Sequence, residues 1–142
     1  MALTYILEPK TLGEQKSKAA QLGIRNLMQT GVQPDIIACR AHTPVTEKAR
    51  QKISIYSNVP LGRVFSMHDC ASIYTIPSML RQSGLDFEVL RMLKIEERIN
   101  LRNERGEWGR WCDFVDKIDN YTHEVTIGIT GKYTSVRDSY AS

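Results

Sequence analysis

The sequence has few cysteines and no long apolar run. Its 142 residues include only three cysteines, Cys39, Cys70 and Cys112, and no two of them form a C-x-x-C pair. An odd number of widely spaced cysteines argues against a disulfide framework or a zinc site, so we expect reduced, structural thiols. No apolar run approaches the roughly 20 residues that a membrane-spanning helix needs. The first ten residues lack a secretory signal, so we expect a cytoplasmic protein without a membrane partner.

The chain also has no concentrated positive charge. Its 19 lysines and arginines exceed its 16 acidic residues by only three, and they are spread along the sequence. A nucleic-acid interface needs basic residues gathered on one face, and an RNA-binding module usually adds an aromatic stacking platform. A basic RNA-binding domain is therefore disfavoured. The composition, 42% hydrophobic and 25% charged, is that of a folded globular chain.

Helical and strand-like patterns alternate through the first 94 residues. Apolar residues recur at helical spacing in four segments, residues 17–29, 46–57, 77–84 and 87–94. Asp86 is the expected cap of the last of these helices. Between them lie two short apolar runs, Ile36–Cys39 and Arg63–Met67, which are typical of strands buried on both faces. This alternation predicts an α/β fold with a parallel sheet.

The pattern changes after residue 94. Residues 96–107 are rich in charge, which predicts an exposed connector. A second amphipathic helix is expected beyond it, with one face made by Trp108, Trp111, Cys112 and Val115, so its two indoles should dock on a neighbouring surface. Residues 124–133 alternate between apolar and small or polar side chains, which predicts a further strand.

Two lysines, Lys16 and Lys18, stand where a loop enters the first expected helix. A helix N-terminus offers unpaired N–H groups and a partial positive charge, so it favours an anion. Lysine ammonium groups add point charges that suit a polyphosphate. The alternative is that both lysines are simply solvated, because such pairs are common on protein surfaces.

Five short segments of the sequence are distinctive: GEQKSK, GVQPDIIACR, KISIYSNVP, HDCASIYTIP and EVTIGITGKY. In their residues, order and approximate spacing they resemble the CTP synthases, the glutamine-dependent enzymes that aminate UTP. The resemblance implies a Rossmann-like parallel-sheet fragment of a P-loop-type amidoligase domain, then a linker helix and the first strand of a class I glutaminase domain. The corresponding ranges are residues 1–94, 95–123 and 124–142.

The resemblance also implies nucleotide-binding roles for particular residues. UTP, and CTP as a feedback inhibitor, would contact Lys16, Ser17, Lys18, Ala19, Ala20, Gln21 and Lys52. ATP would contact Arg40, His68, Asp69 and Cys70. From the residues alone, Lys52 remains open as a solvated lysine, His68 as a polar loop residue and Asp69 as a helix cap.

The loop departs from the family pattern at Ala19-Ala20, where the family has Pro-Thr, and at Leu22-Gly23, where it has His-Ser. Losing the proline loosens the loop, and losing the threonine removes a hydroxyl donor. We therefore expect the lysines to keep phosphate binding, whereas the case for base recognition is weaker.

The sequence contains no G-x-x-x-x-G-K-[ST] phosphate loop. The resemblance implies that this loop and the Mg²⁺ ligands precede the segment and that the glutaminase nucleophile follows it. We thus expect no catalytic residue and no metal ligand here, and no activity of the segment alone. The parent would be a homo-tetramer that uses ATP, Mg²⁺ and glutamine to convert UTP to CTP. The alternative function is a noncatalytic, nucleotide-binding regulatory module.

Overall fold

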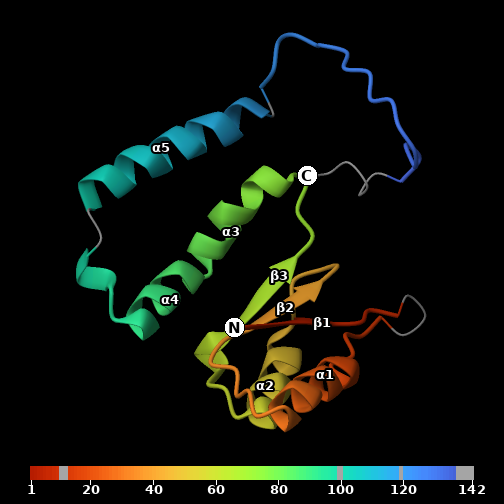
Figure 1. The fold of residues 1–142 in the computed structure, drawn as a ribbon, viewed down its shortest axis with the longest axis vertical. Helices are drawn as coiled ribbons and strands as arrows, with labels where there is room; N and C mark the ends of the chain where they lie inside the picture. The colour runs from red at the N-terminus through yellow and green to blue at the C-terminus, as the bar shows by residue number, and fades with distance from the viewer. Residues whose placement is uncertain (10–12, 99–100, 119, 137–142) are drawn as a thin grey trace.

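A computed structural model describes residues 1–9, 13–98, 101–118 and 120–136. Three strands, β1 (Ala2–Tyr5), β2 (Ile37–Ala41) and β3 (Val64–His68), form one parallel sheet in the order β1-β2-β3 (Figure 1). Ala2 pairs with Ile37, and Ile37 pairs with Val64. The predicted parallel α/β fold is therefore confirmed for these residues.

Helices cover both faces of the sheet. On one side lie α1 (Lys18–Gln29) and α2 (Glu47–Ser57), and on the other lie α3 (Ile76–Gln82) and α4 (Leu85–Leu93) (Figure 1). A fifth helix, α5 (Leu101–Ile118), runs beside α3. Three short 3₁₀ turns occupy Leu61–Arg63, Ile73–Thr75 and Glu96–Arg98.

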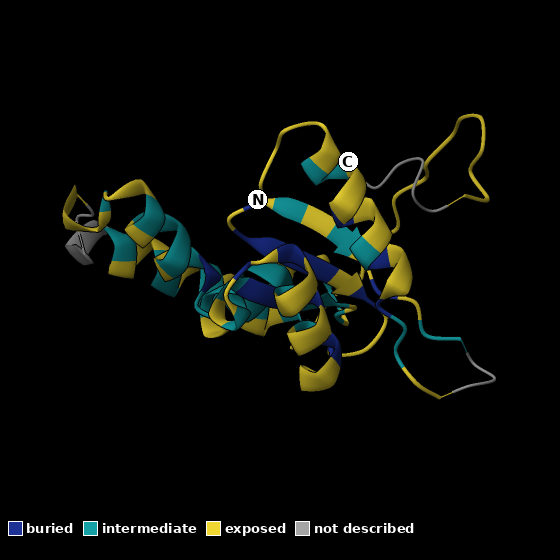
Figure 2. Cartoon of the chain, turned by 90° about the horizontal axis from the view of Figure 1, so that it is seen from below, coloured by how far each residue is buried: buried dark blue, intermediate teal, exposed yellow. Residues whose placement is uncertain are grey.

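The core is centred on β2, which is buried on both faces. Ile37 and Cys39 face α1 and α2, where they cluster with Ile53 of α2. On the opposite side, Phe65 of β3 packs with Leu85 of α4. Figure 2 shows the buried residues gathered in the sheet, as a strand covered on both faces requires.

Local signals place the ends of α1 and α2 as predicted. The Thr46 hydroxyl accepts a hydrogen bond from the backbone N–H of Ala49 at 3.3 Å and so caps α2. Asn58 ends this helix in a left-handed conformation. In α1 the C-cap residue is Thr30, and Gly31 follows it with a φ of +87°, which glycine adopts without a steric cost.

The start of α4 differs from the prediction. The helix begins at Leu85 and its N-cap is Gly84, so Asp86 lies inside the first turn and is not the cap. Burial of the Leu85 side chain explains the shift, since the helix must begin early enough to place it in the core. Leu93, at the other end of α4, is exposed.

The predicted amphipathic helix is present, but it is longer than expected. It begins at Leu101, within the segment expected to be an exposed connector. Glu104 forms an ion pair with Arg81 of α3, and the Arg81 guanidinium lies 4.6 Å from the Trp108 ring centroid. Trp111 lies 6.3 Å from the ring of Tyr74. The docking of both indoles is therefore confirmed, and the charged residues take part in it.

The strand expected in residues 124–133 is not formed, and this prediction was wrong. The described residues from 120 to 136 contain no strand, and the side chains of Val125 and Ile127 are 85% and 79% exposed. A strand requires a hydrogen-bonded neighbour, and the three described strands pair only with one another. By contrast, β1 was missed; in it Ala2 and Thr4 are partly buried, whereas the larger side chains of Leu3 and Tyr5 are exposed.

We expect Ile53→Ala to lower the free energy of unfolding by about 2–5 kcal/mol, because it leaves a cavity in a fully buried position. Ile55→Ala is the matched control on the same helix, where the side chain is 83% exposed. It should change stability by no more than about 0.5 kcal/mol. Urea unfolding followed by circular dichroism measures both. Equal losses in the two variants would contradict the described packing of α2.

Candidate functional site

The loop that follows β1 is tied to the turn that follows β2. The Gln15 amide donates to Glu8 Oε1 at 2.6 Å and to the Pro44 carbonyl at 2.9 Å. Its own oxygen accepts from the backbone N–H of Thr46 at 2.7 Å. The Glu8 carboxylate also accepts from the backbone N–H and the hydroxyl of Thr43. Both segments are thus held together at the carboxyl edge of the sheet.

These bonds stabilise the ionised form of Glu8. The hydrogen bond from the Thr43 hydroxyl, followed by that from Gln15, lowers the pKa of the Glu8 carboxyl. A carboxylate that accepts several donors stays charged and fixes the donors around it. Glu8 therefore acts as the anchor of the loop.

Beside this tie lies a cavity of about 410 Å³ lined by Glu14, Lys48 and Lys52 among others. Glu14 Oε2 accepts from the Lys16 ammonium at 2.8 Å, and Glu14 Oε1 lies 3.3 Å from the Lys48 ammonium. Hydrogen bonds from Lys16 and then Lys48 lower the pKa of the Glu14 carboxyl. Lys48 and Lys52 line the cavity, and Glu14 joins Lys16 to Lys48, so three lysines and two carboxylates, Glu8 and Glu14, gather in and beside it. This excess of positive charge is a setting for a multiply charged anion.

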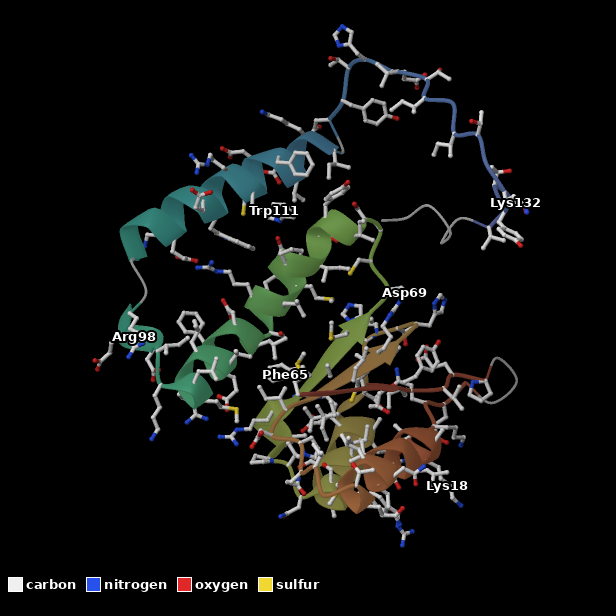
Figure 3. All side chains as sticks on the ribbon, in the orientation of Figure 1. Lys18, Phe65, Asp69, Arg98, Trp111 and Lys132 are labelled. Atoms are coloured by element: carbon white, nitrogen blue, oxygen red, sulfur yellow. The ribbon has the colours of Figure 1, made fainter. Side chains whose placement is uncertain are left out.

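Lys18 lies on a different surface, on α1 (Figure 3). It lines a groove of about 430 Å³ with Gln21 and Arg25 of α1 and Tyr56 of α2. Lys16 and Lys18, which were expected to meet one phosphate chain together, do not line the same cavity. Lys16 lies before the N-cap residue Ser17 and pairs through its backbone with Leu7, whereas Lys18 is the first residue of α1, which accounts for the difference.

The other predicted loop residues are divided between surface and interior. Ala19 lines the same groove as Lys18. The Gln21 amide donates to the Ser17 hydroxyl at 3.0 Å, so it is already engaged within the chain. Ser17 is buried, and Ala20 belongs to the core beneath α1. The side chain of Ala20 is therefore not available to a ligand, contrary to the expectation for this position.

The four residues expected to contact ATP line one cavity of about 170 Å³ at the carboxyl end of β3. They are Arg40, His68, Asp69 and Cys70. Its apolar wall is made by Met67, Ile73, Ile76 and Met79. A cavity with a planar guanidinium on one side and apolar side chains on another suits a flat, aromatic base.

Polar contacts fix the geometry of this second cavity. Arg40 forms an ion pair with Asp69, and its Nη1 donates to the Met67 carbonyl at 3.3 Å. Nδ1 of His42 lies 2.5 Å from the other Asp69 oxygen. The alternative reading of Asp69 as a helix cap is wrong, since its carboxylate serves these two side chains. His68 lies 3.2 Å from the Ser66 hydroxyl, which itself accepts from the backbone N–H of Val45.

Sequence reasoning assigned no role to several residues of the two cavities. His42 contacts Asp69 across 27 positions, which only the pairing of Ala41 with His68 in the sheet brings together. Gln15 lies within the GEQKSK segment that resembles the family, so its position could have indicated a role at the site. Lys48 lies one helical turn before Lys52, and that spacing places both on one face of α2.

Within the described residues, no group of three or more His, Cys, Asp or Glu side chains is placed to hold a metal ion. None of the helices in the described ranges is long and apolar enough to span a membrane.

The amino-acid sequence is similar to those of known proteins. Residues 1–95 match the family model described as the CTP synthase N-terminus. The chain is 38% identical over 140 residues to the CTP synthase of Thermococcus gammatolerans and 37% identical over 140 residues to that of Pyrococcus furiosus. Each alignment covers 99% of this chain but 25% of the relative. The chain thus spans about a quarter of the length of these relatives.

We expect the Asp69 carboxyl to titrate below the ordinary aspartate pKa of about 3.9. Hydrogen bonds from His42 and then Arg40 favour its ionised form and lower its pKa. Because the folded pKa is the lower one, this contribution to stability is present above the unfolded pKa and is lost as the pH falls through the folded pKa. A ¹³C NMR titration of the carboxyl carbon measures the midpoint. Arg40→Gln should raise it, and a midpoint that stays the same would contradict the ion pair.

Proposed function

This chain belongs to the CTP synthase N-terminal family, and from that premise we propose that it supplies UTP-, CTP- and ATP-binding residues to a CTP synthase. The observation that carries the proposal is the cavity at the carboxyl edge of β1 and β2, which Lys48 and Lys52 line and beside which Glu14 joins Lys16 to Lys48. Ligands of open parallel sheets bind at this edge. Three ammonium groups suit a triphosphate, which carries several negative charges.

In the proposal Lys18, Ala19 and Gln21 also bind the nucleotide, but they line the separate groove between α1 and α2. In our proposal a neighbouring subunit completes the site, so that one nucleotide meets the first cavity of one subunit and this groove of another. The family resemblance supports this arrangement, because it implies a homo-tetramer with UTP sites at the interface. Separation of Lys16 from Lys18 in one chain then has a functional reason.

The adenine ring of ATP is proposed to occupy the second cavity. Arg40 offers a planar cation for stacking, and Met79 and Ile76 supply apolar contact. Backbone groups of His68, Asp69 and Cys70 would meet the polar edge of the base. The ion pair from Asp69 holds the Arg40 guanidinium in place before the nucleotide arrives.

The remaining assignments follow the family. We propose that residues 1–94 form the C-terminal part of the amidoligase domain, residues 95–123 the interdomain linker and residues 124–142 the start of the glutaminase domain. The parent reaction would phosphorylate the uracil 4-oxygen with ATP and then displace phosphate with ammonia from glutamine. On the family resemblance alone, we assign no Mg²⁺ ligand and no catalytic residue to this segment.

Lys52→Ala is expected to weaken UTP binding by about tenfold or more, because a hydrogen bond to a charged group is lost. Isothermal titration of the chain with UTP, CTP and ATP measures the effect. The loss should extend to CTP, which shares the triphosphate, and should spare ATP.

Lys117→Ala removes the same charge from an exposed position on α5 and is the matched control. It should leave all three affinities unchanged. Equal UTP affinities of Lys52→Ala and Lys117→Ala would contradict the assignment of Lys52 to the triphosphate site. Loss of ATP binding in Lys52→Ala would mean that the two nucleotide sites have been assigned wrongly.

A further inference from the structure

We propose that Glu14 is the resident counter-anion of the first cavity, that an incoming triphosphate displaces its carboxylate, and that Lys48 then becomes a phosphate-binding residue. The inference rests on the proposed nucleotide-binding function and adds a gating carboxylate and a further cation to that site. Both residues lie outside the set that the family resemblance implied.

The geometry makes Glu14 a bridge between two elements. One carboxylate oxygen faces Lys16 of the loop at 2.8 Å, and the other faces Lys48 of α2 at 3.3 Å. A phosphate oxygen pair placed between the same two ammonium groups would find the same partners. Lys52 lines the cavity one turn further along α2 and makes no ion pair with any described residue. The site therefore holds more positive charge than Glu14 neutralises.

The backbone around Glu14 is held firmly, whereas its side chain is not. Gln15 is bonded to Glu8, Pro44 and Thr46, and the backbone N–H of Lys16 donates to the Leu7 carbonyl at 2.8 Å. The Glu14 side chain itself is half exposed, and its polar contacts in the described residues are the two lysines. Exposed ion pairs of this kind are weak and exchange readily with solvent. The carboxylate can leave while the lysines keep their places.

Repulsion between negative charges requires the Glu14 carboxylate to move away when a triphosphate binds. A carboxylate that stayed between Lys16 and Lys48 would lie within a few ångströms of phosphate oxygens and would repel them. A triphosphate brings several negative charges, so it replaces the lost pairs and engages Lys52 as well. In the empty protein Glu14 also reduces the mutual repulsion of Lys16 and Lys48, which stabilises the site without a ligand.

The test compares four variants of the full 142-residue chain by isothermal titration at low ionic strength. The probes are UTP and inorganic tripolyphosphate, which carries the charge but no base. Glu14→Gln should bind both probes about 2- to 30-fold more tightly, the range expected from releasing two exposed ion pairs. Lys48→Gln should bind both more weakly. In Glu14→Gln/Lys48→Gln, the gain from the first change should shrink, because one of the released cations is gone.

Glu47→Gln is the matched control. It makes the same charge change on the residue before Lys48, but Glu47 accepts a hydrogen bond from Gln51 and is not part of the lysine bridge. Its effect should be less than about twofold. Equal tightening in Glu14→Gln and Glu47→Gln would overturn the inference, because the effect would then be one of general charge. Thermal melts by circular dichroism check that all variants are folded.

The outcomes separate this inference from the proposed function. If UTP binds the unmodified chain and Glu14→Gln does not bind it more tightly, the counter-anion role of Glu14 is refuted, whereas the proposed nucleotide site is retained. If Glu14→Gln tightens tripolyphosphate but UTP binds no better than tripolyphosphate, the counter-anion stands and the pyrimidine assignment is wrong. If neither probe binds the unmodified chain or Glu14→Gln, both are wrong.

Discussion

The candidate site depends on one polar tie, in which Gln15 and Glu8 join the loop after β1 to the turn after β2. A parallel sheet brings the carboxyl ends of neighbouring strands to one edge, but it does not hold the connecting segments in register above that edge. Here an ionised carboxylate with several donors does so. Lys16 from the loop and Lys48 from α2 consequently lie within reach of one carboxylate, although they are 32 positions apart in the sequence.

The two cavities use the sheet in different ways. The first is built above β1 and β2 from long, charged side chains, whose positions depend on the surrounding polar contacts. The second lies between the end of β3 and the start of α3, where apolar side chains define its wall. Arg40 leaves β2 between the buried residues Cys39 and Ala41, so the sheet itself aims its guanidinium at Asp69. The two cavities therefore have the chemical character that the proposed triphosphate and base require.

Much of the fold was predictable because burial leaves a periodic trace in the sequence. The run Ile36–Cys39 indicated β2, and helical spacing over residues 17–29 and 46–57 indicated α1 and α2. The site was less predictable because its contacts join distant positions. The His42 and Asp69 pair follows from strand register, and the separation of Lys16 from Lys18 depends on how Ser17 enters the helix. The alternation in residues 124–133 predicted a strand wrongly, because a strand also needs a neighbouring strand for its hydrogen bonds. Periodicity within one segment does not show whether such a neighbour is present.

Cys39 gives β2 a built-in reporter. Burial raises the pKa of its thiol to about 11, so the reactive thiolate is scarce while the sheet is closed. Alkylation of the thiol at neutral pH therefore requires β2 to become accessible to solvent. The alkylation rate then reports how often the central strand opens. The alkylation rate of Cys39, the residue beside Arg40, thus measures the stability of the strand that carries Arg40.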